Sequence, residues 1–316
     1  MQEFLVMLKN VIIFVLLALP GYIAVKAKLF KKEDSNIVSK LALNIAVPFF
    51  IAASTLGINL TGEFAVQLLI TGAVYSAFVV VLFFLAKVFI KKGDNNKLAG
   101  MERFCIIFSN NGFIGLPLAE AVFGAGSVVL AHIVVINVIN NVLLMVLGPY
   151  MFTGDKSTIS FKGIVKSPVL IAFVLALAVN LIGIKEVTGE VLYYSNFLKN
   201  MVTPLSMTIL GMKFADVKIS SFFTTKKLYY ISFLKLIAFP VIIMGILLIV
   251  NIFIPVSQEL MFTMFIGFGT STASLTTSLA DRYNTGGKEA SIYVLGTTLF
   301  SVITLSILYA VLCMLI

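Results

Sequence analysis

The chain has 316 residues, of which 60% are apolar and only 12% are charged, and its mean hydropathy is +1.08. These values exclude an ordinary soluble domain and are typical of a protein that crosses a membrane several times. The net charge of +9 suggests a nucleic-acid partner at first sight, but the positions of the basic residues argue against one.

Ten apolar runs follow one another along the chain. Each has about twenty residues, which is long enough to cross about 30 Å of hydrocarbon. We therefore expect an all-α, polytopic membrane protein with ten transmembrane helices. The expected spans cover residues 4–25, 37–56, 64–90, 102–122, 127–152, 164–184, 190–214, 227–254, 259–280 and 289–315.

Most of the 23 basic residues lie beside alternate loops of this arrangement. By the positive-inside rule those loops are cytoplasmic, so we expect both termini on the non-cytoplasmic side of the cell membrane. The charge excess is then an orientation signal, and no nucleic-acid partner is expected. The residues are Lys26, Lys28, Lys31, Lys32 and Lys40 after the first helix, Lys87, Lys91, Lys92, Lys97 and Arg103 after the third, Lys156, Lys162 and Lys166 after the fifth, Lys213, Lys218, Lys226 and Lys227 after the seventh, and Arg282 and Lys288 after the ninth.

The fourth expected helix contains Asn110-Asn111-Gly112-Phe113-Ile114-Gly115-Leu116-Pro117. Glycine allows the backbone to leave helical geometry, and proline can begin a new helical segment. We expect the helix to run to about Asn110, open, and restart at about Pro117. The restarted half then directs its positive end toward the membrane centre, where it favours a carboxylate. The candidate substrate-binding residues are Asn110, Asn111, Gly112, Gly115 and Pro117. The alternative is a simple proline kink, with the asparagines bonded to a neighbouring helix.

Glu120 follows Pro117 by three residues and is the best candidate for proton coupling, because carboxylates inside a membrane are costly and usually functional. The alternative is a carboxylate in an outer loop at a helix end.

In the fifth helix, Asn137, Asn140 and Asn141 have helical spacing, which indicates hydrogen bonds between helices. The single His132, in the outer part of the same helix, is expected to be packed or solvated.

Two features recur at nearly constant spacing and indicate an internal repeat, with residues 1–156 as the first five-helix unit and 157–316 as the second. Because five is odd, the second unit must enter the membrane with inverted polarity. Inverted repeats are common in transporters, which bind substrate near the midplane where the halves meet. A chance likeness of short patterns is the alternative. The recurring features are Asn44-x-x-x-Pro48 with Asn200-x-x-x-Pro204, 156 residues apart, and Glu102 with Glu259, 157 residues apart.

The ninth expected helix resembles the fourth in its interrupted composition. Gly267 and Gly269 precede the segment 270–278, in which seven of nine residues carry a hydroxyl. We expect a second opening here, loosened by the two glycines, that crosses the first at the midplane. The alternative is close helix packing with hydroxyls bonded to their own helix. In the eighth helix, Lys235 is expected to extend to the cytoplasmic face, and a charge partner is left open.

Several function classes are disfavoured by missing motifs. The chain has one histidine, no His-Glu-x-x-His, no paired carboxylates and no phosphate-binding Gly-x-x-x-x-Gly-Lys-Ser/Thr loop, so we expect neither an enzyme nor ATP drive from this chain. Cys105 and Cys313 lie in apolar context and predict neither a disulfide nor a metal site, and no cofactor is expected. Two hypotheses remain: a secondary transporter of a small carboxylate, and a membrane-embedded ligand sensor or regulatory subunit.

The pattern Asn110-x4-Gly115-x-Pro117 and the ending Ala280-x-x-Tyr283 of the ninth helix resemble the auxin efflux carrier family, in particular its short-loop bacterial, PIN-like members. The resemblance covers the whole chain. It implies an elevator-type secondary carrier of small organic anions, with crossed, broken helices four and nine and a homodimeric assembly. Asn110 and Pro117 would then be crossover residues.

One departure from the family pattern concerns the ninth helix. The family usually has proline at that crossover, and counting back from Ala280 places Ser271 at its position. The repeat spacing from Pro117 indicates Ser274 instead. We therefore expect the second opening between Ser271 and Ser274, with Ser271, Thr272 and Ser274 as substrate-binding residues, and a smaller opening or none if proline is required.

Overall fold

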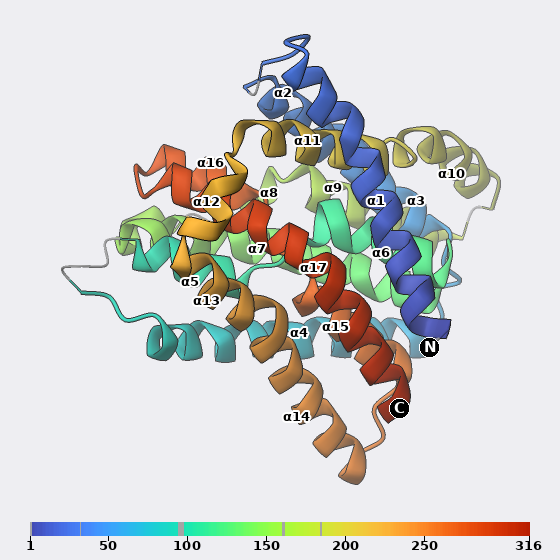
Figure 1. Ribbon diagram of the computed structural model, residues 1–316. Helices are drawn as coiled ribbons and strands as arrows, with labels where there is room; N and C mark the ends of the chain where they lie inside the picture. Colours follow the sequence, from blue (N-terminus) through green and yellow to red (C-terminus); the bar gives the residue numbers. More distant parts are fainter. Residues whose placement is uncertain (1, 32, 94–97, 160–161, 184) are drawn as a thin grey trace.

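The computed structural model describes residues 2–31, 33–93, 98–159, 162–183 and 185–316 (Figure 1). This part of the chain is helical, and its only β-type pairing is one isolated bridge between Ser109 and Thr272. The all-α class is thereby confirmed. Lys32, Lys97 and the expected end of the sixth span at residue 184 lie outside the described residues.

The structure divides the expected spans into the following elements. They are α1 (Gln2–Lys26), α2 (Asp34–Leu41), π-helix η1 (Ala42–Ala46), α3 (Val47–Leu56), α4 (Gly62–Phe89), α5 (Ala99–Ile107), π-helix η2 (Asn111–Gly115), α6 (Leu116–Phe123), α7 (Val128–Thr153), 3₁₀-helix η3 (Lys156–Thr158), α8 (Lys162–Val165), α9 (Pro168–Ile182), α10 (Lys185–Lys199), α11 (Val202–Asp216), α12 (Ile219–Thr224), α13 (Lys226–Phe233), π-helix η4 (Leu234–Ala238), α14 (Phe239–Phe253), α15 (Gln258–Gly269), α16 (Leu275–Arg282) and α17 (Gly287–Leu315).

The expected count of ten spans is not confirmed. Within the described residues, six helices are long and apolar enough to cross a membrane, and the pair α8 and α9, bent by 40°, would make a seventh. The other three expected spans are divided, into α5, η2 and α6, into α10 and α11, and into α15 and α16, and these α-helices have 8 to 15 residues each. At 1.5 Å per residue such pieces are about 12–22 Å long, which is too short to cross alone. The six helices cover residues 5–26, 34–56, 62–89, 128–153, 226–253 and 287–315.

All three π-helical turns lie directly before an x-Pro pair. The prolines are Pro48, Pro117 and Pro240, each at the second residue of the α-helix that follows. Proline has no N–H to donate and its ring collides with the carbonyl four residues earlier. The wider π turn gives that carbonyl more room, so the helix continues past the proline with its axis displaced.

Helices α1 and α11 touch through their backbones. A Cβ on Gly21 would collide with the Thr208 carbonyl oxygen, and one on Gly211 would collide with the Ala18 carbonyl oxygen. Small residues at such contacts are the usual way for membrane helices to pack closely, because lipid provides little hydrophobic driving force between helices. On the same side of the molecule α3 packs against α9 and α10.

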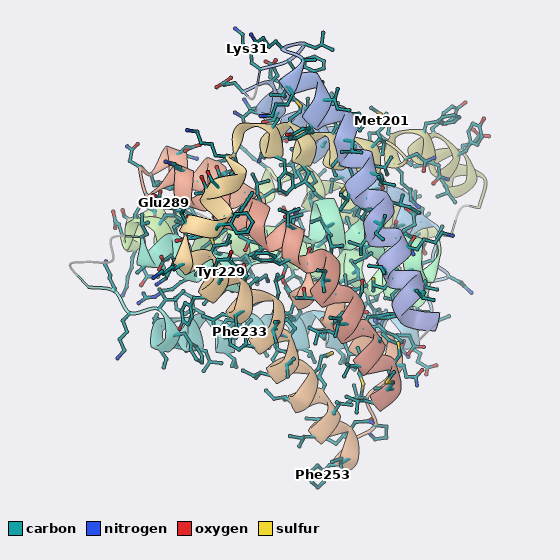
Figure 2. All side chains as sticks on the ribbon, in the orientation of Figure 1. Lys31, Met201, Tyr229, Phe233, Phe253 and Glu289 are labelled. Carbon is teal, nitrogen blue, oxygen red and sulfur yellow. The ribbon has the colours of Figure 1, made fainter. Side chains whose placement is uncertain are left out.

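The remaining long helices surround the two divided ones. α7 packs against α4, α5, α6 and α15, while α17 packs against α13 and α16. Figure 2 shows Tyr229, Phe233 and Phe253 in succession along α13 and α14, with Phe253 at the end of the molecule away from Lys31. Phe253 and Phe233 are exposed, as expected for side chains in contact with lipid. Both chain termini lie near one another in Figure 1.

Candidate functional site

The two interrupted helices cross in the interior and pair through their backbones. α5 ends at Ile107 and α15 ends at Gly269, and each is followed by an extended stretch. The Asn110 N–H donates to the Ser271 carbonyl at 2.8 Å, and the Ala273 N–H donates to the Phe108 carbonyl at 3.0 Å. The openings and the crossing expected from the sequence are therefore confirmed. We call Phe108–Asn110 together with Thr270–Ser274 the crossing.

The boundaries of the first opening differ from expectation. The helix restarts at Asn111, in a π turn, and not at about Pro117, which is the second residue of α6. Gly112 and Gly115 lie inside this turn, and neither has a positive φ, so they do not open the backbone. Their missing side chains matter for space, since a Cβ on Gly115 would lie 3.2 Å from the Asn111 Oδ1.

The second opening occurs where the two counting arguments placed it, without a proline. Thr270 is extended and α16 begins at Leu275, with Ser274 as its N-cap residue. Gly267 and Gly269 belong to α15, so they precede the opening and do not form it. The Ser271 hydroxyl accepts a hydrogen bond from Thr298 at 3.0 Å, which ties the opening to α17.

Side chains from neighbouring helices satisfy the backbone groups that the openings release. The Thr272 hydroxyl donates to the Cys105 carbonyl at 2.9 Å, and the Asn140 amide donates to the Ser109 carbonyl at 3.2 Å. The Thr272 N–H donates to the Thr297 hydroxyl at 3.2 Å. An unsatisfied backbone group costs several kcal/mol in hydrocarbon, so these contacts stabilise the open conformation inside the membrane.

A second set of hydrogen bonds joins the same amides to α4. The Tyr75 hydroxyl donates to the Asn140 Oδ1 at 2.9 Å and lies 3.4 Å from the Asn111 Nδ2. The Thr270 hydroxyl lies 3.3 Å from the Asn111 Oδ1. Asn111 and Asn140 are thus used by the protein itself, and the hydrogen bonds between helices expected for the α7 asparagines are confirmed for Asn140.

Two other amides beside the crossing keep hydrogen-bonding capacity. Asn110 is only 7% exposed, and the structure gives its side chain no hydrogen-bond partner among the described residues. The Asn137 Nδ2 is buried and has no partner either, although its Oδ1 accepts from Asn141 at 3.3 Å. A Cβ on Gly112 would lie 3.4 Å from the Asn137 Oδ1, so Asn137 faces the π turn. Amide N–H groups left over in this way can donate to an oxygen of a ligand.

Lys235 contributes a positive charge that sequence reasoning placed wrongly. It lies in η4, is only 1% exposed, and its ammonium donates to the Ser109 hydroxyl at 2.5 Å and to the Phe268 carbonyl at 3.2 Å. The expected extension to the cytoplasmic face is therefore incorrect. The sequence did contain a signal of this depth. Lys235 follows Lys227 by eight residues, a rise of about 12 Å along the helix, and a lysine side chain is too short to span that distance back to the membrane surface.

Glu120 lies on α6 and not in an outer loop. Its Oε1 lies 2.6 Å from the ammonium of Lys199, at the end of α10, with the two side chains 25% and 8% exposed. Glu120 thus lies in the last turn of α6, which agrees with the helix-end part of the alternative but not with a loop position. The ion pair joins α6, the restarted half of the fourth helix, to α10, which belongs with α1, α3, α9 and α11.

A cavity of about 540 Å³, lined by both polar and apolar side chains, lies near the Asn137 side of the crossing. Its wall is formed by α2, η1, α7, α9 and α16, and it includes Asn141, one helical turn from Asn137. The substrate-binding residues expected from the sequence do not line it. Lys40, Asn44, Ser278 and Asp281 are among its other polar residues, and all lie toward the basic loops.

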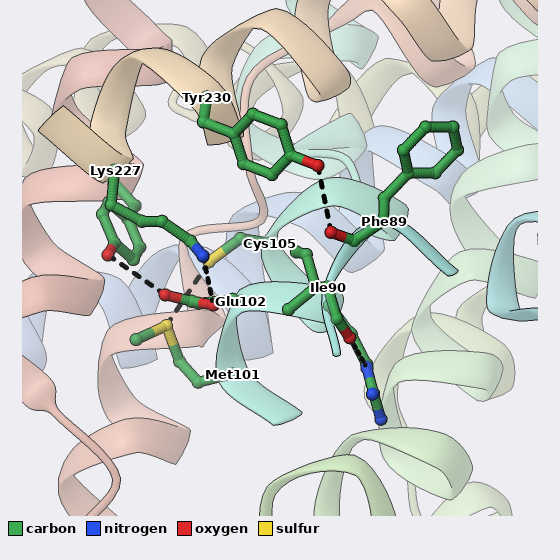
Figure 3. Close-up of polar contacts among 9 residues, drawn as sticks. Phe89, Ile90, Met101, Glu102, Cys105, Lys227 and Tyr230 are labelled. Atoms are coloured by element: carbon green, nitrogen blue, oxygen red, sulfur yellow. Dashed lines mark hydrogen bonds and ion pairs between the residues drawn. The ribbon is translucent and has the colours of Figure 1, made fainter. Parts of the chain in front are cut away.

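The start of α5 is held by a separate polar cluster (Figure 3). The ammonium of Lys227 lies 3.3 Å from the Glu102 Oε2, and the Tyr293 hydroxyl lies 3.4 Å from its Oε1. The Tyr230 hydroxyl donates to the Phe89 carbonyl at 3.0 Å. This cluster fixes α5 to α4, α13 and α17, so the half-helix enters the crossing from a fixed end.

The remaining candidates have structural surroundings. His132 is buried, stacks on the Phe64 ring and lies 3.4 Å from the Thr71 hydroxyl, so it is packed. Cys105 is buried on α5 and Cys313 is partly buried on α17. Across the described residues no group of three or more His, Cys, Asp and Glu side chains could hold a metal ion.

Comparison with known proteins identifies the family. The family described as membrane transport protein matches residues 5–162 and again residues 155–309. The chain belongs to this family. The resemblance to auxin efflux carriers is thereby confirmed, and the two matches meet near the middle of the chain. A relative described as an uncharacterized transporter, from Methanothermobacter thermautotrophicus, is 26% identical over 213 residues, which cover 65% of this chain and 67% of the relative.

Proposed function

We propose that this membrane transport protein is a secondary active transporter that carries a small organic anion, a carboxylate, across the cell membrane by an elevator-type movement. One observation carries the proposal: two interrupted helices cross in the protein interior and are joined there by two backbone hydrogen bonds. Transporters of several folds bind their substrate at discontinuous helices of this kind, near the bilayer midplane.

The charge distribution around the crossing supports an anionic substrate. The restarted helices, η2–α6 and α16, begin there, and helix N-termini attract anions through their free N–H groups and dipole. Asn110 and Asn137 provide amide donors, and the segments 108–115 and 270–275 contain no Asp or Glu. We therefore propose that the carboxylate binds between Asn110, Asn137 and the two helix N-termini, with Ser271, Thr272 and Ser274 shaping the opposite side.

The proposed movement divides the helices into two groups. The first is α1, α2–α3 and α9–α11, held by the glycine contact of α1 with α11. The second contains the crossing and the helices around it. In this proposal the halves 1–156 and 157–316 are inverted repeats of five helices each, both termini face the non-cytoplasmic side, and the protein forms a homodimer as its family resemblance implies.

The test is uptake of labelled mono- and dicarboxylates into proteoliposomes. Asn110→Ala should lower uptake by about 10- to 100-fold, the effect of losing one hydrogen bond of 1.5–3 kcal/mol to a charged group. Folded yield should change little, because Asn110 joins the crossing through its backbone. Asn251→Ala, at the exposed end of α14, is the control.

Two outcomes would contradict the proposal. Binding of a carboxylate without flux would identify a ligand sensor or regulatory subunit. Wild-type uptake by the Asn110→Ala variant would remove Asn110 from the binding site.

A further inference from the structure

The buried charge of Lys235 has no acidic partner in the described part of the chain. The ion pairs found there are Lys199 with Glu120 and Lys227 with Glu102. Burial of an ammonium costs several kcal/mol unless other groups replace its water. Here a hydroxyl and a backbone carbonyl do so, at 2.5 Å and 3.2 Å.

Both of these oxygens lie at the C-terminal ends of half-helices. Phe268 is the next-to-last residue of α15, and Ser109 is the second residue after α5. The last carbonyls of a helix carry partial negative charge and stabilise a cation. In transporters with broken helices, the coupling Na⁺ or H⁺ binds at unwound carbonyls and half-helix C-termini. The Lys235 ammonium lies between the C-terminal ends of the two half-helices, where other carriers of this kind bind a cation.

The side chain reaches this site from a third element. η4 packs against both α5 and α15, so Lys235 joins the two half-helices that end at the crossing. The other ionisable groups on these helices are engaged or distant: Glu102 contacts Lys227, Arg103 donates to the Ile90 carbonyl, and Glu259 lies in the first turn of α15. Cys105, also on α5, is buried and its Sγ donates to the Met101 Sδ at 3.6 Å.

We propose that the Lys235 ammonium is a resident cation, which takes the place that a coupling metal ion occupies in other carriers with broken helices. Transport then requires no Na⁺, and shortening the side chain creates a site for a small monovalent cation, best filled by an alkylammonium. The transport part of this inference rests on the proposed function. The cation site itself does not.

The first experiment replaces the cation in wild-type proteoliposomes. Uptake measured in Na⁺, K⁺ or N-methylglucamine buffers of equal ionic strength should agree within about twofold. A strict requirement for Na⁺ would overturn the inference while leaving carboxylate transport intact. Absence of any uptake would contradict the proposed function and leave the second experiment as the test.

The second experiment uses Lys235→Ala, which removes three carbons and the ammonium, and n-propylammonium, which supplies three carbons and an ammonium. Thermal unfolding in detergent should occur at lower temperature in the variant, and n-propylammonium should restore it in a saturable manner, because a ligand that binds the folded state stabilises it by mass action. Uptake, where measured, should recover in parallel. Neutral n-propanol has a similar volume but no charge, so it shows whether the restored stability depends on the charge or only on filling the space. Lys226→Ala, at the exposed start of α13, is the matched control.

Lys235→Met provides a variant of similar volume without charge. It should unfold at lower temperature than the wild type and transport at least tenfold more slowly. Wild-type uptake by Lys235→Met would overturn the inference. So would restoration of Lys235→Ala by n-propanol as well as by n-propylammonium, because that result assigns the side chain to packing alone.

Discussion

The two interrupted helices reach the same open conformation with different residues. In the first, the opening is bordered by Asn110 and Asn111, and Pro117 follows after a π turn. In the second, threonines and serines form the opening, and no proline is present. The comparison shows that proline is not needed to open these helices. What both openings share is side chains that take over the released backbone groups.

The first opening should depend most strongly on one amide. Asn140→Leu removes the donor to the Ser109 carbonyl and the acceptor of the Tyr75 hydroxyl, and should lower the free energy of unfolding by roughly 3 kcal/mol. Denaturant unfolding in detergent measures the effect. Asn141→Leu is the matched control, because its amide bonds only to its own helix. Equal losses in both variants would contradict the assignment.

The restarted half-helices α6 and α16 also differ in their contacts with α10 and α11, the two parts of the expected seventh helix. Glu120 on α6 forms an ion pair with Lys199, whereas Thr277 on α16 lies 3.5 Å from the Lys213 ammonium. Glu120→Gln leaves the buried Lys199 charge unpaired and should cost about 2 kcal/mol of stability, less than a fully buried pair because Glu120 is partly exposed. Thr277→Ala should cost clearly less.

Transport measurements with Glu120→Gln test the proposed proton coupling. If this carboxylate carries the proton, the variant should lose dependence on a pH gradient while substrate exchange continues. Unchanged gradient dependence in a folded variant would assign Glu120 to the ion pair alone.

The second opening should depend on its hydroxyls. Thr272→Val keeps the side-chain shape and removes the hydrogen bond to the Cys105 carbonyl, at a cost of about 1–2 kcal/mol. Thr304→Val removes a hydrogen bond within α17 and should change stability by less than about 0.5 kcal/mol. A comparison of their unfolding temperatures decides whether the opening needs this hydroxyl.

Changing the prolines at the two openings should have the smallest effect. Thr270 has φ −69° and ψ 160°, the backbone conformation that the residue before a proline prefers. Ser271→Pro fits this backbone but removes the hydroxyl that accepts from Thr298, so it should cost about 1 kcal/mol and lower uptake. Pro117→Ala should change the unfolding free energy by less than about 1 kcal/mol and keep uptake within a few-fold. A collapse of uptake in Pro117→Ala alone would show that the π turn itself is required.

The sequence predicted some of these features better than others. The amides and hydroxyls were correctly interpreted as marking two crossing openings, because polar groups of that density have few other uses inside an apolar span. The glycines lie inside helical turns and do not form the openings. The restart at Asn111 was missed, since proline was assumed to begin the new helix when it follows a π turn. Helix seven was expected as one span, and the break at Asn200 that divides it was interpreted only as a repeat signal.

Lys235 illustrates a different limit. Its residue type and depth are visible in the sequence, but its partners are Ser109, just after α5, and Phe268 in α15, which are 126 and 33 residues away. No local pattern connects a lysine with the ends of two other helices. Such a group is found only when the three elements are placed together.

The glycine contact between α1 and α11 also limits how the protein can move. Where two backbones touch directly, no side chain can change rotamer to accommodate sliding, so that interface has a single fit. In the proposed elevator-type movement, displacement is therefore expected at faces that side chains cover, such as those of α1 against α6 and α17. Bulkier residues at Gly21 or Gly211 would force α1 and α11 apart, and in that proposal the group of helices that stays in place would lose its shape.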